Sequence, residues 1–536
     1  MRAAGGMIIL GLHRDPWHDT GAALILDKAN GPHIVSLSQE RLDRVKDSRA
    51  FPGEAIAACM ADSGVQSIDD FYLVVLDYIR VPDWRCDEHR TPAARGTLLD
   101  RIAPERIHVI NHHLAHACST FYCSGYEDAA ILVVDGRGSD NETQSLFVGE
   151  GRAIRRIEHT DRIGIGLLYA AVTQAIGFGL LQEGKTMGLA PYGPDGPGTL
   201  LGIGKHYDGI VTDYADRCIE GSYDLREPVQ VESFAAKAHA AFEVQKECEE
   251  ALLHLAAHAR KLTGKSRLCL SGGVALNSVA NLVVLQSGLF EEVFINPAAS
   301  DTGIPLGAAL YGHHVIAGKP RLKNIVSPFV GPLHSKQEIA AAAAMAQDRC
   351  RIERGEVLEK AADLLAANRI VGHFHGRSEM GPRALGNRSI LMSPAKAENK
   401  DVLNARVKHR EPFRPFAPAC LEDRAAEFFE IDRPSPYMLL VPAVRRDKRA
   451  VIPAVTHVDG TGRLQTVSKA DNARFHQLIG LFAARTDIPV LLNTSFNDNG
   501  EPIVESPQDA VRCFLSTDID ALVLEDVLLI KARADA

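Results

Sequence analysis

Two histidines, His112 and His116, lie four residues apart in the segment NHHLAHACSTF. If this segment is helical, both imidazoles project from one face, because residues i and i+4 are neighbours on a helix. The apolar run Ala129 to Val134 follows and leads to Asp135; its length fits a buried strand. Imidazoles and carboxylates from separate elements bind Fe(II), Mn(II) or Zn(II). The residues indicate a metal site, with packed or surface histidines as the alternative.

Two glycine turns follow expected strands. Gly136-Arg137-Gly138 comes directly after Asp135, and Gly272-Gly273 comes after the segment RLCLS. Backbone N–H groups at strand ends and helix starts bind anions, and glycine leaves them unobstructed. Both turns therefore indicate contacts with a nucleotide phosphate.

Basic residues gather in the last third of the chain. Between Arg377 and Arg414 the sequence has nine Lys and Arg against four Asp and Glu. The segments GRSEMGPRALGNRS and KHREPFRPFAP mix arginine with Gly, Pro and Phe, which favours tight turns over an amphipathic helix. Arginine binds phosphate and carboxylate oxygens in a bidentate manner. This region therefore indicates an anion site, with a solvated basic face as the alternative.

Two single lysines have weaker signals. Lys185 lies in EGKTMGLAPYG, which we expect to be a loop, and a lysine in a loop is more often solvated than bound to a ligand. Lys46 ends the charged segment ERLDRVK, whose charges are explained most simply as the solvated face of a helix.

The elements that must position these residues have α/β character. Met7 to Leu12 and the run AALIL predict two strands around the turn HRDPWHDTG, which carries Asp15, His18 and Asp19. This opening is typical of several nucleotide-binding folds, and an ordinary hairpin explains it equally well. A helix is expected from Ser233 to Leu262, ending at Thr263-Gly264.

Two strand–glycine–helix units follow that helix. The first is RLCLSGGVALN, and the second runs from EEVFINP through Asp301-Thr302-Gly303 into IPLGAALYG. Successive units of this kind predict an α/β domain with helices covering the sheet. The Pro/Gly/Ser-rich stretch Lys323 to Lys336 suits a linker, after which RIVGHFHG and PVLLN read as further strands. No internal repeat is evident.

Bulk properties exclude several classes. A chain of 536 residues is too long for one core, so two or more domains are expected. The net charge of −9 argues against nucleic-acid binding. The N-terminus has no secretory signal pattern, and no apolar run approaches the ~18 residues of a membrane span. The ten cysteines contain no CxxC pair, which favours reduced thiols in a cytoplasmic protein.

Eight segments in this order resemble the O-carbamoyltransferase family of antibiotic and nodulation-factor biosynthesis, whose acceptors include aminoglycosides such as tobramycin. They are HHLAHA, VVDGRGSD, EGKTMGLAPYG, LSGGVALN, PAASDTGIPLGAAL, GRSEMGPRALGNRSIL, NARVKHREPFRPFAP and LLNTSFNDNGEPI. GPRALGNRSIL and REPFRPFAP are long and highly specific, and the resemblance covers nearly the whole chain. The opening GLHRDPWHD departs from the family's commoner form.

The resemblance implies two domains with separate tasks. Residues 1–335 would form an actin/Hsp70-like metal- and nucleotide-binding domain, and residues 336–536 a YrdC-like α/β domain. The second domain would convert carbamoyl phosphate and ATP into carbamoyl adenylate and pyrophosphate. The first would pass the carbamoyl group to a hydroxyl of a small-molecule acceptor and release AMP. Fe(II), Mg²⁺ and ATP are the cofactors implied, and a homodimer would be unsurprising.

The resemblance also implies residue roles. The metal ligands would be His112, His116, Asp135 and Asp301, with His113 as a rival if the helix register differs. His18 would assist the transfer beside Asp19. The carbamoyl-phosphate and ATP pocket would use Lys46, Arg383, Lys408, Arg414, Arg463, Asn493 and Ser495. Nucleotide contacts in the first domain would come from Gly136, Arg137, Gly138, Lys185, Gly272, Gly273 and Asn277.

Three other functions fit parts of the sequence. A small-molecule kinase of the actin superfamily would release ADP and would leave the basic third without a task. A tRNA threonylcarbamoyl-modifying protein shares the domain types, but the net charge is unfavourable for tRNA. An ATP-gated scaffold of the Hsp70 type would need no paired histidines.

Overall fold

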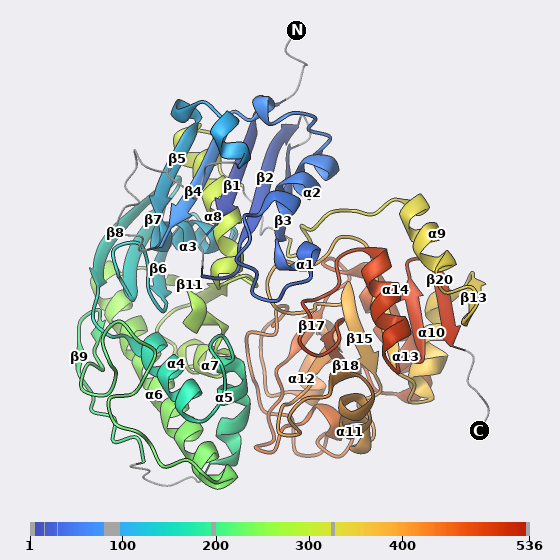
Figure 1. The fold of residues 1–536 in the computed structure, drawn as a ribbon. Coiled ribbons are helices and arrows are strands. Elements are labelled where there is room, and N and C mark those ends of the chain that lie inside the picture. The colour runs from blue at the N-terminus through green and yellow to red at the C-terminus, as the bar shows by residue number, and fades with distance from the viewer. Residues whose placement is uncertain are drawn as a thin grey trace. The chain divides into compact units, whose positions relative to one another are not determined.

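The computed structural model describes residues 6–14, 17–28, 31–79, 97–193, 200–322 and 327–531. The chain forms two compact units (Figure 1). Unit 1 comprises residues 1–43 and 47–326, and unit 2 comprises residues 44–46 and 327–536. The division at 326/327 lies close to the expected boundary at 335/336. Asp15 and residues 323–326 of the expected linker lie outside the described residues.

The first sheet of unit 1 has five strands in the order β3-β2-β1-β4-β5. The strands are β1 (Ile8–His13), β2 (Gly21–Lys28), β3 (Gly31–Ser38), β4 (Leu73–Tyr78) and β5 (Ile107–Asn111). The first three form an antiparallel meander, and β4 and β5 continue parallel to β1. The hairpin expected from the sequence is therefore present, as the first part of a larger, mixed five-stranded sheet.

The second sheet of unit 1 repeats this order as β8-β7-β6-β11-β12. Its strands are β6 (Asp128–Val134), β7 (Gln144–Glu150), β8 (Ala153–Thr160), β11 (Arg267–Ser271) and β12 (Glu292–Ile295). Again three antiparallel strands precede two parallel ones. This duplicated arrangement confirms the actin/Hsp70-like fold class. The repeat lies in the topology and not in the residues, which is why the sequence does not reveal it.

Helices α3 (His112–Phe121) and α8 (Ile304–Tyr311) each follow the last strand of one sheet and pack against the other. Thus α3 lies on β6 and β11, α8 lies on β1 and β2, and the two helices contact each other. A Cβ at Gly307 would stand 2.1 Å from the carbonyl oxygen of Ala115, and one at Gly11 would stand 2.0 Å from that of Pro305. Glycine at these positions lets α3, α8 and β1 approach closely.

The remaining helices of unit 1 are α1 (Glu40–Asp43), α2 (Gly53–Ser63), α4 (Ile165–Ala175), α5 (Glu183–Leu189), α6 (Phe234–Thr263) and α7 (Ser278–Gln286), with a small hairpin of β9 (Tyr207–Asp208) and β10 (Val211–Thr212). Among these helices, α2 packs on β2 and β3, and α6 packs on β6 (Figure 1). The predicted helix is α6, which begins at the Ser233 cap and ends at Gly264 in the left-handed conformation.

Two local predictions in unit 1 are wrong. The segment expected to be a loop around Lys185 forms α5, because Thr186 and Leu189 are buried and the helix packs on α6. The charged segment expected to be a solvated helix forms only α1, and Arg41 within it is buried. Burial and repulsion from Asp19 also raise the pKa of Glu40 to about 7. Each segment is therefore partly buried.

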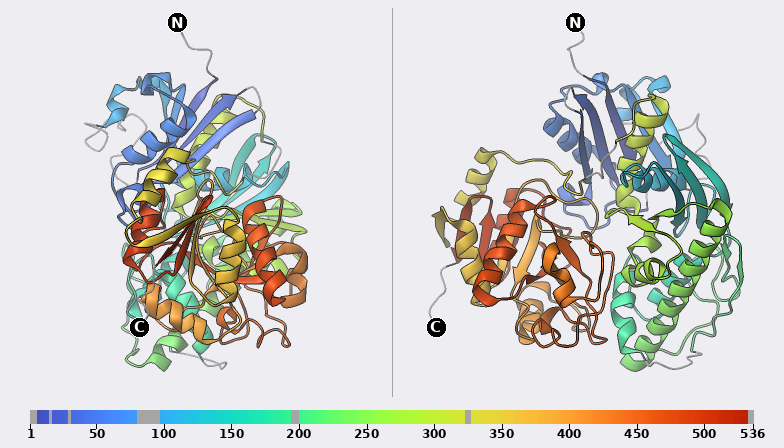
Figure 2. Two further views of the ribbon diagram at one scale, coloured as in Figure 1. Left: turned by 90° about the vertical axis from the view of Figure 1, so that its right-hand side faces the viewer. Right: turned by 180° about the vertical axis from the view of Figure 1, so that it is seen from behind.

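Unit 2 is an α/β unit with one mixed, eight-stranded sheet (Figure 2). The strand order is β13-β20-β19-β14-β15-β18-β16-β17. The strands are β13 (Cys350–Arg354), β14 (Val371–Phe374), β15 (Arg388–Met392), β16 (Ala417–Leu421), β17 (Gln465–Val467), β18 (Val490–Ser495), β19 (Ala521–Leu524) and β20 (Val527–Lys531). Its apolar residues form one continuous core, in which Phe374, Phe475 and Phe496 are fully buried.

Six α-helices accompany this sheet within the described residues. They are α9 (Lys336–Ala344), α10 (Val357–Ala366), α11 (Glu398–Leu403), α12 (Ala425–Phe428), α13 (Ala473–Thr486) and α14 (Pro507–Ser516). Helix α10 packs against α13, and α9 packs against α14. Within the described ranges no helix is both long and apolar enough to span a bilayer, and the nine described cysteines are unpaired thiols.

Candidate functional site

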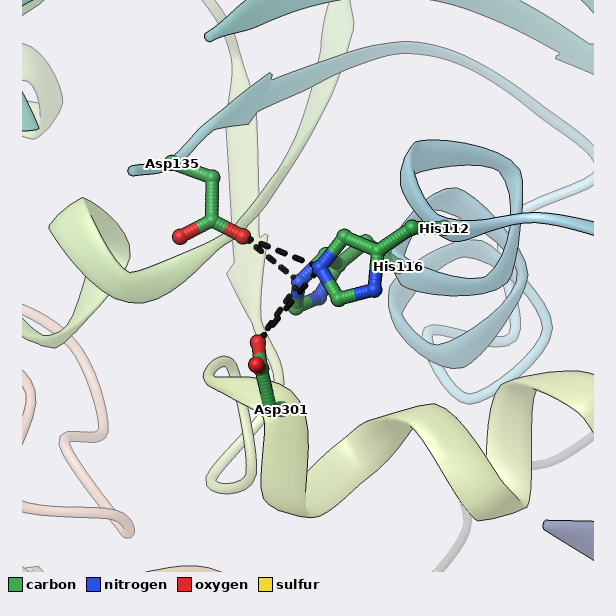
Figure 3. A group of neighbouring side chains, drawn as sticks. All are labelled: His112, His116, Asp135 and Asp301. Carbon is green, nitrogen blue, oxygen red and sulfur yellow. Dashed lines mark hydrogen bonds and ion pairs between the residues drawn. The ribbon is translucent and has the colours of Figure 1, made fainter. Parts of the chain in front are cut away.

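Unit 1 brings together the four residues expected to bind metal (Figure 3). One donor atom from each of His112, His116, Asp135 and Asp301 lies within 4.8 Å of the others. The Nε2 atom of His116 is 2.9 Å from Oδ2 of Asp135 and 3.3 Å from Oδ1 of Asp301. The Nε2 atom of His112 is 3.3 Å and 3.5 Å from the same two oxygens. Both imidazoles therefore face both carboxylates.

Three separate elements position these donors. Asn111 caps α3 by accepting the backbone N–H of Leu114 at 3.1 Å, which starts the helix that carries both histidines. Asp135 follows the end of β6, and Asp301 begins the short turn that leads into α8. The ligands thus come from the ends of elements that the rigid pairing of α3 and α8 holds in place.

The charges in the cluster favour ionised carboxylates. Burial alone would raise the pKa of Asp301, but attraction to His112 and hydrogen bonds with both histidines hold it well below its usual range. Hydrogen bonds with the same histidines outweigh burial at Asp135 and lower its pKa. Two carboxylates and two imidazole nitrogens converging from three elements suit Fe(II) better than a soft metal. The donor set therefore fits the implied iron.

His113 is placed apart from the cluster. Its Nδ1 atom lies 2.8 Å from the Ser145 hydroxyl, and burial lowers the pKa of its imidazole well below the usual value. His113 is therefore a packed, neutral residue. The face of α3 that points to Asp135 and Asp301 carries His112 and His116, which favours these two as the ligand pair.

The glycine turns lie beside the same cluster but use several of their N–H groups internally. Gly136 and Gly273 both donate to Oδ1 of Asp135, at 2.8 Å and 3.1 Å. The N–H of Gly138 donates to Glu142, and that of Gly272 donates to Ala299. These amides orient Asp135 and close the turns. That these turns bind phosphate stays a prediction. Since the four glycine N–H groups already have acceptors, other groups of the turns would have to contact the phosphate.

The other predicted nucleotide contacts of unit 1 are Asn277, Arg137 and Lys185, each with its own local surroundings. Asn277 caps α7 by accepting the N–H of Ala280, and its side chain also bonds with Gln245 of α6. Arg137 is partly exposed beside the Gly136 turn. Lys185 lies in α5, with its Nζ atom 5.5 Å from the ring centroid of Phe178. The described contacts of Asn277 are those of a helix cap and of a link between α7 and α6.

His18 and Asp19 lie beside the metal cluster. The Nδ1 atom of His18 is 3.3 Å from Oδ2 of Asp19 and 3.7 Å from Oδ2 of Asp301. The His18 side chain keeps 27% of its surface exposed, whereas His112 and His116 have none. Oxygen atoms of Asp19, Glu40 and Asp47 also come within 4.8 Å of one another. His18 therefore occupies the solvent-accessible edge of the cluster.

Unit 2 gathers the predicted basic residues into a second cluster, with opposite electrostatics. Burial and repulsion from Arg414 lower the pKa of Arg383 to about 10. Burial and repulsion from Arg383, Arg410 and Arg414 lower the pKa of Arg463 well below its usual value. Guanidinium groups keep their proton in proteins. The lowered pKa values therefore indicate that burying these positive charges together, without an anion, is energetically unfavourable.

Few carboxylates offset these cations. Arg414 lies 3.6 Å from Glu411, but within the described part of the chain no ion pair joins Arg383, Arg410 or Arg463 to a carboxylate. The Nε atoms of Arg383 and Arg463 and Oδ1 of Asn493 are buried there without a hydrogen-bond partner. Buried polar atoms normally have partners. The unpartnered Nε donors and the uncompensated charge are the features that an anionic ligand would complete.

Lys408 and Ser495 border this cluster. The Lys408 ammonium donates to the carbonyl oxygens of Ser495 and Asn497 at 2.7 Å and 2.9 Å, and to Asn497 Oδ1 at 2.5 Å. Burial, followed by repulsion from Arg410, lowers the pKa of Lys408 to about 7. The amide of Asn493 donates to Ala384 in the loop that carries Arg383. Strand β18 therefore links the two basic segments.

The segment Arg44–Lys46 belongs to unit 2 by its contacts. Arg44 donates to the carbonyl oxygens of Pro502 and Ile503 at 2.7 Å and 2.8 Å. Lys46 itself is exposed in this segment. Its grouping with unit 2 agrees with a role beside the basic cluster, which remains a prediction.

The structure adds two residues that sequence reasoning missed. Arg410 lies in the segment KHREPFRPFAP between two predicted site residues, with its guanidinium carbon 4.3 Å from the ring centroid of Phe416. The only sequence feature that could have identified Arg410 is its place in this arginine-containing segment. Asp77 accepts a hydrogen bond from His112 at 2.7 Å. It ends an apolar strand far away in sequence, and nothing local marks it.

Comparisons with known proteins agree with the two-unit organisation. A family model described as "Carbamoyltransferase N-terminus" matches residues 83–310. A second, described as "Carbamoyltransferase C-terminus", matches residues 362–531. The first match falls within unit 1 and the second within unit 2.

Curated relatives match most of the chain. "Nodulation protein NolNO" of Sinorhizobium fredii is 38% identical over 96% of this chain and 79% of its own length. "Nodulation protein NolO" of Bradyrhizobium diazoefficiens is 39% identical over 79% of each chain. Among solved structures, HypF of T. kodakarensis has a TM-score of 0.36 and 14% identity, over 60% of this chain and 49% of that one. The fold assignment rests on the strand order, not on this weak structural similarity.

Proposed function

The chain belongs to the carbamoyltransferase family and is a carbamoyltransferase, and from this premise we propose an ATP-dependent O-carbamoyl transfer in two stages. Unit 2 activates carbamoyl phosphate as carbamoyl adenylate. Unit 1 transfers the carbamoyl group to a hydroxyl of a small-molecule acceptor. The observation that carries the proposal is the basic cluster of unit 2, in which Arg383, Arg410 and Arg463 form no ion pair with a carboxylate among the described residues.

The activation step needs this kind of site. Carbamoyl phosphate reacts with water to give carbamate and inorganic phosphate. A carbamate oxygen then attacks the α-phosphorus of ATP, the bond from that phosphorus to the β-phosphate bridge breaks, and pyrophosphate leaves. Two anionic reactants must approach each other, so electrostatic stabilisation is the main catalytic requirement. ATP enters as its Mg²⁺ complex.

The proposed roles in unit 2 follow from the charges. Arg383, Arg410 and Arg463 bind phosphate oxygens with their unused donors. Arg414 adds charge at the edge of the cluster, where Glu411 already neutralises part of it. Lys408, Asn493 and Ser495 hold β18 and the loop of Arg383 in register, so that these donors converge before ligand binds.

In the transfer step, the acceptor oxygen attacks the carbamoyl carbon, the bond to the AMP oxygen breaks, and AMP leaves. His18 accepts the hydroxyl proton, because it is the imidazole at the accessible edge of the cluster and lies beside Asp19. His112, His116, Asp135 and Asp301 would hold the iron, which would supply positive charge for the adenylate phosphate. The glycine turns after β6 and β11 place backbone beside that phosphate.

Product analysis tests the proposal. Purified protein is incubated with carbamoyl phosphate, Mg-ATP and a panel of hydroxyl compounds, and phosphorus NMR identifies the products. We expect AMP, pyrophosphate and inorganic phosphate, formed only when carbamoyl phosphate is present. ADP as the product would instead indicate a kinase, and carbamoylation of tRNA-linked adenosine alone would indicate the tRNA-modifying alternative.

The transfer half has its own test. The His18→Asn variant, supplied with preformed carbamoyl adenylate, should lose transfer by ~10²–10⁴-fold, the usual contribution of a general base. A wild-type rate in this assay would remove His18 from the mechanism without touching the activation step.

A further inference from the structure

Asp77 lies behind the metal cluster, at the end of β4, and is 2% exposed. Its two carboxylate oxygens are used by two different imidazoles. Oδ2 is 2.7 Å from Nδ1 of His112, and Oδ1 is 2.9 Å from Nδ1 of His13. The carboxylate therefore bridges a proposed metal ligand and a histidine that has no role in the proposed function.

This bridge fixes the tautomer of both rings. An ionised carboxylate only accepts hydrogen bonds, so each imidazole must present a protonated Nδ1 to Asp77. The Nε2 atom of a neutral ring then carries the lone pair. For His112 this atom faces Asp135 and Asp301. For His13 it lies 3.7 Å from Oδ2 of Asp301.

His116, the second proposed histidine ligand, has a weaker hydrogen-bond partner than His112 has. Nδ1 of His116 has the Ser271 hydroxyl at 3.4 Å, which is at the outer limit of a hydrogen bond. A hydroxyl can donate or accept, so Ser271 does not impose a tautomer on His116. The carboxylate at His112 is therefore the stronger constraint on the orientation of the pair.

We infer that Asp77 is the positioning residue of the metal centre: it holds His112 with Nε2 available for metal, and His13 braces Asp77 from the other side. This inference rests on the proposed metal-binding role of His112. Partners of this kind orient ligating histidines, and their loss typically lowers metal affinity by ~10–100-fold.

Two substitutions of graded severity test it. Asp77→Leu removes the carboxylate acceptor from Nδ1 of both imidazoles. We expect the affinity for Fe(II) and for Co(II), measured by competition with a chelator, to fall by ~10–100-fold. Asp77→Asn keeps one acceptor oxygen, so its affinity should lie between that of Asp77→Leu and wild type. The matched control is Asp27→Asn, which removes a carboxylate bound to His313 in the same unit and should leave metal affinity unchanged.

Outcomes separate the inference from its premise. If wild-type protein binds no stoichiometric metal, the proposed metal centre itself fails. If wild type binds metal and Asp77→Leu binds it equally well, the inference alone is overturned, and a lower melting temperature would then mark Asp77 as structural. Nitrogen-15 NMR of histidine-labelled, zinc-loaded wild type covers the case in which a variant does not fold. It should find protonated Nδ1 in His112 and His13, and protonated Nε2 in His112 would overturn the inference.

Discussion

The two clusters of this molecule have opposite needs. In unit 1, Asp135 and Asp301 face two imidazoles within a few ångströms, so the cluster gathers carboxylate oxygens and imidazole nitrogens at one point. In unit 2, Arg383, Arg410 and Arg463 lie together without carboxylate ion pairs in the described residues. The first arrangement suits a cation and the second suits an anion, which is the basis of the proposed function.

The contrast explains how one chain can divide a reaction. Building an acid anhydride from two anions requires concentrated positive charge. Passing the carbamoyl group to an alcohol requires instead a base, for which we propose His18, and an ordered pocket for the leaving nucleotide. A single site could not hold both sets of charges without neutralising itself. Separate variants should therefore disable the two halves independently.

The largest expected effect is in unit 2. Arg463→Gln should weaken activation by ~10²–10³-fold, as expected when a buried charged donor to a reacting group is removed. Calorimetric titration with carbamoyl phosphate should show a similar loss of affinity. Arg485→Gln is the matched control, because Arg485 pairs with Glu359 and Asp363 and should bind as wild type does. Equal losses in both variants would contradict a specific anion site.

A comparable loss is expected for metal in unit 1. His116→Gln removes a proposed direct ligand, so metal affinity should fall by at least ~100-fold, the upper range for residues that only support a ligand. Metal analysis of the dialysed protein measures this. The control His313→Gln changes a histidine that bonds Asp27 and should retain metal. Full metal content in His116→Gln would refute the proposed ligand set.

Arg410 should contribute a smaller share. Arg410→Gln removes one charged donor. In the structure this guanidinium also makes a long hydrogen bond of 3.4 Å to the carbonyl oxygen of Pro415. A hydrogen bond to a charged group contributes about 1.5–3 kcal/mol, so we expect roughly 10- to 100-fold weaker binding of carbamoyl phosphate. Unchanged binding would show that Arg410 only packs against Phe416.

The smallest effect concerns pH. The pKa of Lys408 is about 7 in the folded protein against an ordinary value of 10.5. Between these values the unfolded chain binds more protons than the folded one, so this lysine makes stability rise with pH from about 7 to about 10. In urea titrations, Lys408→Met should flatten that rise, while Lys336→Met, an exposed residue of the same unit, should not. An identical slope in all three proteins would mean that Lys408 stays charged.

Part of this organisation is visible in the sequence. The spacing of His112 and His116 predicts a shared helix face, and α3 has that face because Asn111 caps it. Strand-end aspartates and glycine turns follow from apolar runs with polar ends. Asp135 and Asp301 approach the same two histidines although they are far apart in the sequence. Local sequence patterns do not predict this proximity, and only the family resemblance implied it.

Other features have no local signature. Asp77 looks like any polar residue at a strand end, because its two histidine partners are distant in sequence. The segment around Lys185 reads as a loop from its Gly and Pro content, and tertiary packing on α6 makes it helical. The duplicated sheets share strand order but no evident residue pattern.

The most direct test of the central claim is exchange of labelled pyrophosphate into ATP, measured side by side in wild type, Arg463→Gln and His116→Gln. We predict carbamoyl-phosphate-dependent exchange in wild type and in His116→Gln, and its near-complete loss in Arg463→Gln. Exchange that disappears with His116 and survives without Arg463, or that is absent from wild type, would contradict the division of labour between the two clusters.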